Sequence, residues 1–108
     1  LIDFSEITMD NVKILQRMSP FGLGNKKPVF RTNNCFLDNQ LKFVGKASQI
    51  VKSKIKDELG KELSFISFNN KEELVNVKSK FDILYTIDVN SYSGKDEIQL
   101  MLREVYVK

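Results

Sequence analysis

Hydrophobic and polar residues alternate through much of the chain after residue 28, and this period of two predicts β-strands. The alternation is clearest on a run that holds Phe81, Ile83, Tyr85, Ile87 and Val89. Turn-forming residues separate this run from similar segments on either side. We therefore expect strands over residues 28–37, 41–46, 49–57, 62–69, 81–90 and 97–107.

Two segments have helical spacing instead. Apolar residues repeat every three positions from Met9 to Met18, and the Thr8 hydroxyl can accept a hydrogen bond at the start of such a helix. The helix should end before Pro20, because the residue that precedes a proline avoids the helical region. A short second helix is expected over residues 71–78, after two asparagines that can cap it.

From residue 41 onward the predicted order is three strands, a helix and two strands. This order is typical of the OB-fold, a small five-stranded Greek-key barrel. An SH3-like barrel would lack the helix, and a ferredoxin-like fold would need two. We predict an all-β OB-fold domain over residues 28–108, with an extra N-terminal strand before the barrel. Residues 1–27 would form a linker helix and a turn-rich segment.

The composition fits one domain and excludes several kinds of chemistry. Of the 108 residues, 42% are hydrophobic and 29% are charged, so a core can form without a metal or a disulfide. The chain has no histidine and only Cys35 as a cysteine, which excludes imidazole catalysis, His-ligated metals and an intrachain disulfide. Cys35 lies among apolar residues and is expected in the core. No apolar run approaches the roughly 18 residues of a membrane span.

The carboxylates and glycines do not predict an active site. The pairs Asp57-Glu58 and Glu72-Glu73 are adjacent in sequence and therefore point in different directions, so we expect them in a turn and on a helix surface. No glycine-rich phosphate loop occurs. We expect no catalytic residue, no metal and no cofactor in this chain.

Positive charge is concentrated in one half of the chain. Residues 13–56 hold ten basic residues and one acid, a net charge of +9, whereas the whole chain carries +3. Such a segment suggests a polyanion as partner, although a solvated lysine-rich surface would have the same composition. The first 20 residues lack the apolar core of a signal peptide, and a lone cysteine fits the cytoplasm. Because the chain begins with Leu1, we expect it to be a fragment.

The predicted barrel offers one surface for such a partner. OB-folds bind oligonucleotides across their second and third strands and the adjoining loops. On the second strand Lys52, Lys54 and Lys56 share one face, which can follow a phosphate backbone, and Tyr92 can stack on a base from the last loop. The candidate nucleic-acid-binding residues are Lys26, Lys27, Arg31, Lys46, Lys52, Lys54, Lys56, Phe65, Tyr92 and Lys95.

Alternatives stay open for several of these residues. Phe65 faces the groove if Ile66 and Phe68 face the core, and it belongs to the core if they face outward. The lysines form either a DNA-binding stripe or an ordinary solvated face. Tyr92 is either a stacking platform or a loop residue that packs on the barrel.

The turn-rich segment carries a family resemblance. Its sequence PFGLGNKKPVF, residues 20–30, resembles the PFGxGNxxPxF signature before the C-terminal OB domain of RecJ, the bacterial single-strand-specific DNA exonuclease. At the start of the second strand the family often has His-Leu-Lys where this chain has Gln49-Ile50-Val51-Lys52, so any role of that histidine is not carried over, though the lysine remains. Weaker similarity to the family lies at residues 2–18, 44–45, 66–69, 90–94 and 99–100.

The resemblance implies a DNA-gripping module without an active site. The parent would degrade single-stranded DNA in the 5′→3′ direction in DNA repair and recombination, using Mn or Mg held by DHH and DHHA1 domains that this chain does not contain. Its partners would be single-stranded DNA, those two domains and a single-strand-binding protein. The alternative is a structural or protein-interaction module that closes the parent's ring or docks a partner.

Overall fold

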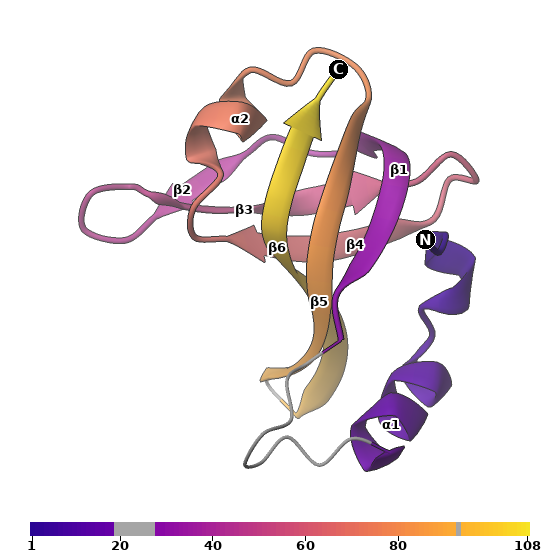
Figure 1. Ribbon diagram of the computed structural model, residues 1–108. Helices are drawn as coiled ribbons and strands as arrows, with labels where there is room; N and C mark the ends of the chain where they lie inside the picture. Colours follow the sequence, from indigo (N-terminus) through magenta and orange to yellow (C-terminus); the bar gives the residue numbers. More distant parts are fainter. Residues whose placement is uncertain (19–27, 93) are drawn as a thin grey trace.

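A computed structural model describes residues 1–18, 28–92 and 94–108 of the chain. These residues form a barrel of β-strands with two short helices and one 3-10 turn (Figure 1). The elements are η1 (Phe4–Glu6), α1 (Met9–Met18), β1 (Phe30–Leu37), β2 (Lys42–Val44), β3 (Ile50–Lys56), β4 (Glu62–Ser67), α2 (Lys71–Val75), β5 (Phe81–Tyr92) and β6 (Lys95–Val107).

The strand order confirms the predicted OB-fold. Neighbouring strands follow the order β1-β5-β6-β4-β3-β2, and an additional pairing between β1 and β3 closes the sheet into a barrel. The pairing of β4 with β6 is parallel, and the other pairings are antiparallel. The helix α2 lies between β4 and β5, as predicted, and buries Leu74. In Figure 1, β3 and β4 cross behind β5 and β6.

The strand predicted as an addition before the barrel is part of its wall. β1 pairs with β5 from Phe30 to Cys35, and its end pairs with β3 at Phe36 and Leu37. β2 continues along the same edge of β3 for only three residues. The interruption at residues 38–41 separates two segments of one barrel edge, and for this reason the sequence pattern placed the start of the barrel too late.

The inward-facing residues of the strands form the hydrophobic core of the barrel. Val51, Ile55, Ile83 and Leu100 are fully buried and alternate with outward residues, as the sequence pattern predicts. Cys35 is also fully buried, and this burial, helped by nearby carboxylates, raises the pKa of its thiol to about 12. The expectation that Cys35 is a core residue is confirmed.

The lead-in before α1 belongs to the same core. Phe4, Ile7 and Val12 are buried in the barrel's hydrophobic cluster, and the Phe4 ring meets Tyr85 edge-on with ring centroids 6.3 Å apart. The Asp57 carboxylate accepts a hydrogen bond from the Phe4 amide at 2.8 Å. The predicted domain boundary after residue 27 therefore does not coincide with a break in packing.

The helix ends differ in how closely they follow prediction. Thr8 caps α1, since its Oγ1 accepts a hydrogen bond from the Asn11 amide at 3.2 Å. α2 is three residues shorter than expected and ends at Val75. Asn70 stands at its N-cap, but the side chain turns back and donates to the Ser67 hydroxyl at 3.1 Å instead of capping the helix.

Candidate nucleic-acid interface

The lysines of β3 lie on the outward side of the barrel. Val51 and Ile55 on the same strand are buried, so the alternating Lys52, Lys54 and Lys56 point away from the core. Alternate residues of a strand are about 6.6–7 Å apart, which is a suitable spacing for consecutive anionic groups. The structure thus contains the predicted stripe.

Two of these lysines already have carboxylate partners. Lys54 pairs with Glu62 at 3.4 Å, and Lys56 pairs with Asp38 at 3.2 Å. Exposed ion pairs of this kind contribute only about 0–1 kcal/mol, so a phosphate can replace either carboxylate. Until it does, the two pairs lower the net positive charge of the stripe.

Lys52 differs because its cross-strand neighbour is another lysine. Lys42 of β2 lies directly opposite Lys52, and neither forms an ion pair within the described part of the chain. Like charges directly opposite on two strands are destabilising. An anion bound between the two ammonium groups would relieve this repulsion, so this pair is the strongest candidate for a phosphate contact.

Lys42 was not among the predicted site residues. The signal lies in the hairpin register, because the pairing of Val44 with Ile50 across the 45–49 turn forces Lys42 opposite Lys52.

A cleft of about 600 Å³ crosses the outward side of β3, β4 and β6. Its floor includes Lys54, Ser64 and Gln99, which lie in register across the three strands. The loop before β2 lines one side, where the Ser53 hydroxyl donates to two backbone oxygens of loop 39–41 at 3.1 and 3.0 Å. The ends of β5 and β6 line the other side. Among the described residues, three lysines, one glutamate and several amide and hydroxyl side chains line this cleft together with Leu41, Phe65 and Ile98, so its lining is net positive and partly apolar.

Of the two alternatives left open for Phe65, the structure supports the core position, and the residue also contributes to the lining of the cleft. Phe65 lies under the floor of the cleft and is only 1% exposed, because it belongs to the inward series of β4 with Leu63. Ile66 therefore points outward beside Lys52. Phe68 is the residue after β4 and is 43% exposed.

The loops place the other candidates around the barrel. Lys46 is exposed in the turn between β2 and β3, where the backbone has positive φ at Gly45 and Ser48. Residues 90–96 were expected to form a loop, but the strands continue to the tip of the hairpin, where Tyr92 pairs with Lys95. Lys95 is exposed and does not line the cleft. The Tyr92 side chain, like Lys26, Lys27 and the rest of segment 19–27, lies outside the described residues.

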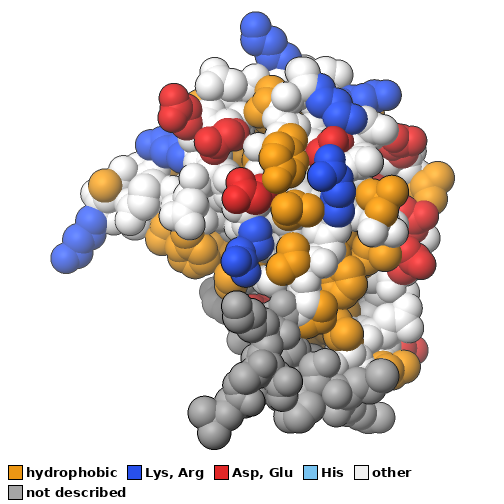
Figure 2. Space-filling view, in the orientation of Figure 1, with side chains coloured by type: hydrophobic (Ala, Val, Ile, Leu, Met, Phe, Trp, Pro, Cys, Tyr) orange, Lys and Arg blue, Asp and Glu red, His pale blue; other side chains and the backbone are white. Residues whose placement is uncertain are grey.

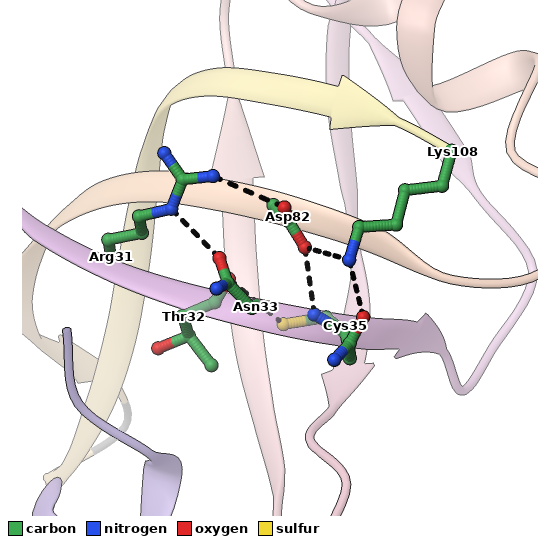
Figure 3. Close-up of polar contacts among 7 residues, drawn as sticks. Arg31, Thr32, Asn33, Cys35, Asp82 and Lys108 are labelled. Atoms are coloured by element: carbon green, nitrogen blue, oxygen red, sulfur yellow. Dashed lines mark hydrogen bonds and ion pairs between the residues drawn. The ribbon is translucent and has the colours of Figure 1, made fainter.

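Arg31 is engaged elsewhere, which contradicts its predicted place near the lysine stripe. It binds Asp82 at 3.2 Å and Asn33 at 2.8 Å (Figure 3). Its guanidinium also lies 5.3 Å from the centroid of the Tyr106 ring. These partners sit on β1, β5 and β6, away from the cleft. The reason is long-range pairing, since Asp82 is 51 residues further along the chain.

Asp82 is the centre of this second cluster. Burial alone would raise its pKa, but hydrogen bonds from the Asn34 amide and Lys108, with the charge of Arg31, lower it overall. Asn34 can donate because a β-bulge gives it a φ of 58° and turns its N–H toward Asp82. The network fixes the carboxylate and the end of the chain (Figure 3).

The face formed by β1, β5 and β6 shows no concentration of positive charge. Figure 2 shows basic and acidic side chains interspersed on this face, with hydrophobic side chains between them. Within residues 1–18, 28–92 and 94–108, no three His, Cys, Asp or Glu side chains come together to hold a metal ion. None of the helices in these ranges has the length and hydropathy to cross a membrane.

Comparison with known proteins identifies the family. The family model for the RecJ OB domain matches residues 1–104. The single-stranded-DNA-specific exonuclease RecJ of Bacillus subtilis (strain 168) is 28% identical over 104 residues, which are 94% of this chain but only 13% of that protein. The mitochondrial single-stranded DNA-binding protein Rim1 of S. cerevisiae has a TM-score of 0.56 at 6% identity, over 76% of this chain and 96% of that chain, a likeness of fold alone. Because the family match spans nearly the whole sequence, as the PFGLGN segment predicted, the chain belongs to the RecJ OB domain family.

Proposed function

We propose that this chain binds single-stranded DNA in the cleft across β3, β4 and β6. The observation that carries the proposal is the Lys42–Lys52 pair, two lysines directly opposite each other on neighbouring strands, neither of which forms an ion pair in the described part of the chain. The names of the two similar proteins, a single-strand-specific exonuclease and a single-stranded DNA-binding protein, support the same ligand.

Binding would begin with the phosphates. Lys42 and Lys52 take one phosphate, and Lys54 exchanges its weak pairing with Glu62 for another. Amide and hydroxyl groups on the cleft floor, such as Ser64 and Gln99, are suited to sugar and base contacts. Double-stranded DNA would be excluded from this mode of binding, because its bases are already paired and cannot contact the floor of the cleft.

Within the parent protein the domain would hold the strand while other domains cut it. In this proposal, DHH and DHHA1 domains of the same parent carry out the 5′→3′ hydrolysis and hold the Mn or Mg that it needs. The parent would act in the cytoplasm. A single-strand-binding protein that delivers the substrate is a further partner in this proposal.

The test is the salt dependence of binding. Fluorescence anisotropy of a labelled oligo-dT of about 20 bases should show affinity that falls as salt rises. The double variant Lys42→Ala/Lys52→Ala should lower the slope of log K against log salt by roughly 0.7, the value for one phosphate contact on a single strand, because the two lysines share one phosphate. The control Lys13→Ala/Lys78→Ala removes the same charge from exposed positions outside the cleft. An equal slope change in both double variants would overturn the assignment of the phosphate site.

One observation favours the alternative of a protein-interaction module. Lys54 and Lys56 are already paired with acidic residues, which leaves the face only moderately basic. Absence of oligonucleotide binding below about 10⁻⁴ M, the weak limit of non-specific affinity, would favour this alternative over DNA binding.

A further inference from the structure

An exposed apolar row lies beside the lysine pair on the same outward surface. Val44 pairs with Ile50, two residues along the strands from Lys42 and Lys52. Because Val51 pairs with Ser67 in an antiparallel register, the backbone of Phe68, the residue after β4, follows next to Ile50. Val44 and Phe68 are among the exposed large hydrophobic residues of the chain. The surface thus places an apolar row about 6.6–7 Å from a cationic row.

Among the described side chains, the exposed Phe68 ring is available to a ligand. Phe43 is 42% exposed, nearly the same as Phe68, but it pairs with buried Val51 and therefore points to the other face of the sheet. There its ring is covered by Lys71, whose ammonium lies 5.1 Å from the ring centroid. Phe68 has no ring or cation contact with any residue in the described ranges.

We propose that Phe68 is a base-stacking platform, and that the neighbouring Lys42 and Lys52 bind the phosphate of the nucleotide stacked on it. This inference rests on the proposed binding of single-stranded DNA and adds the position of one nucleotide. The distance between the two rows is comparable to that between a nucleotide's phosphate and its base. A planar base is the ligand that fits, because an exposed ring stacks on any base regardless of sequence.

The stacking can be detected because the chain has no tryptophan. Phe68→Trp therefore introduces a single tryptophan, whose fluorescence should be quenched on titration with oligo-dT at the concentrations where anisotropy reports binding. Phe43→Trp is the matched control, with the same exposure on the opposite face, and its fluorescence should stay unchanged. Quenching of Phe43→Trp without quenching of Phe68→Trp would overturn the inference.

Affinity measurements separate stacking from phosphate binding. Phe68→Ala should weaken oligo-dT binding roughly 5- to 150-fold, the range of one lost base stack, and should leave the salt slope unchanged. An abasic oligonucleotide of equal length should bind the variant and the unaltered chain equally. Circular dichroism melting of each variant establishes that it is folded, and the tryptophan experiment stands independently if Phe68→Ala unfolds.

The outcomes also distinguish this inference from the proposed function. Strong oligo-dT binding with unquenched Phe68→Trp would refute the stacking platform and leave DNA binding intact. Absence of binding by the unaltered chain would refute both.

Discussion

The Asp57 carboxylate should hold the lead-in segment onto the barrel. One oxygen accepts a hydrogen bond from the Phe4 amide at 2.8 Å, and the other accepts from the Lys61 amide at 3.0 Å. The side chain is buried, so water cannot replace it. Changing Asp57 therefore leaves backbone donors unsatisfied in the interior.

The expected loss of stability follows from these two bonds. Asp57→Asn keeps one acceptor oxygen and presents an NH₂ group to the second donor, so it loses one hydrogen bond to a charged group, about 1.5–3 kcal/mol. Asp57→Ala loses both and should cost up to about twice as much. Because a domain's free energy of unfolding is about 5–15 kcal/mol in total, either effect is readily measured.

Urea denaturation provides the assay. With a slope of about 2 kcal/mol/M, the midpoint of Asp57→Asn should fall by roughly 1 M, and hydrogen exchange at the Phe4 amide should accelerate. Glu58→Gln removes the charge of the adjacent, exposed carboxylate and is the matched control. Identical midpoints for the two amide variants would refute the role given to Asp57.

Two further predictions concern titratable groups. Because the pKa of Asp82 is lowered in the folded state, its stabilising effect is present above its unfolded pKa of about 3.9 and is lost as pH falls through the folded pKa. Asp82→Asn should therefore be less stable than the unaltered chain at pH 7, by about 1.5–3 kcal/mol for one hydrogen bond to a charged group. This difference in stability should shrink at pH 2.5. A difference in urea midpoint that does not change with pH would contradict the prediction. The Cys35 thiol, buried and with a pKa of about 12, should react with Ellman's reagent at pH 8 only after denaturation, and rapid reaction of the folded chain would show that it is accessible.

The parts of the fold that local pattern determines could be predicted from the sequence. The alternation from Phe81 to Val89 falls entirely within β5, and the helix after β4 was placed within a few residues. The extent of the first barrel strand could not be predicted in this way. β1 and β2 share an edge of β3, and that shared edge is created by pairing between distant segments, which no local period reports.

The surface that carries the site could be predicted from the sequence, but not all the residues that belong to it. The period of two placed Lys52 and Lys54 on one face, as found. It could not orient β4, because Leu63 and Phe65 form one apolar series and Ile66 and Phe68 form another, and only the neighbouring strands decide which is buried.

Partnerships across the chain were also beyond local pattern. Arg31 was grouped with the lysines by charge alone, whereas its partner Asp82 lies on a strand far along the sequence.

The burial of the lead-in has a practical consequence for anyone who shortens this protein. Phe4 and Ile7 are fully buried in the same hydrophobic cluster as the inward residues of the strands. A version truncated to start at residue 28 would lose both side chains and expose to solvent the hydrophobic residues that they cover. Poor expression or aggregation of such a truncated protein would then result from its exposed hydrophobic core and would say nothing about its affinity for DNA.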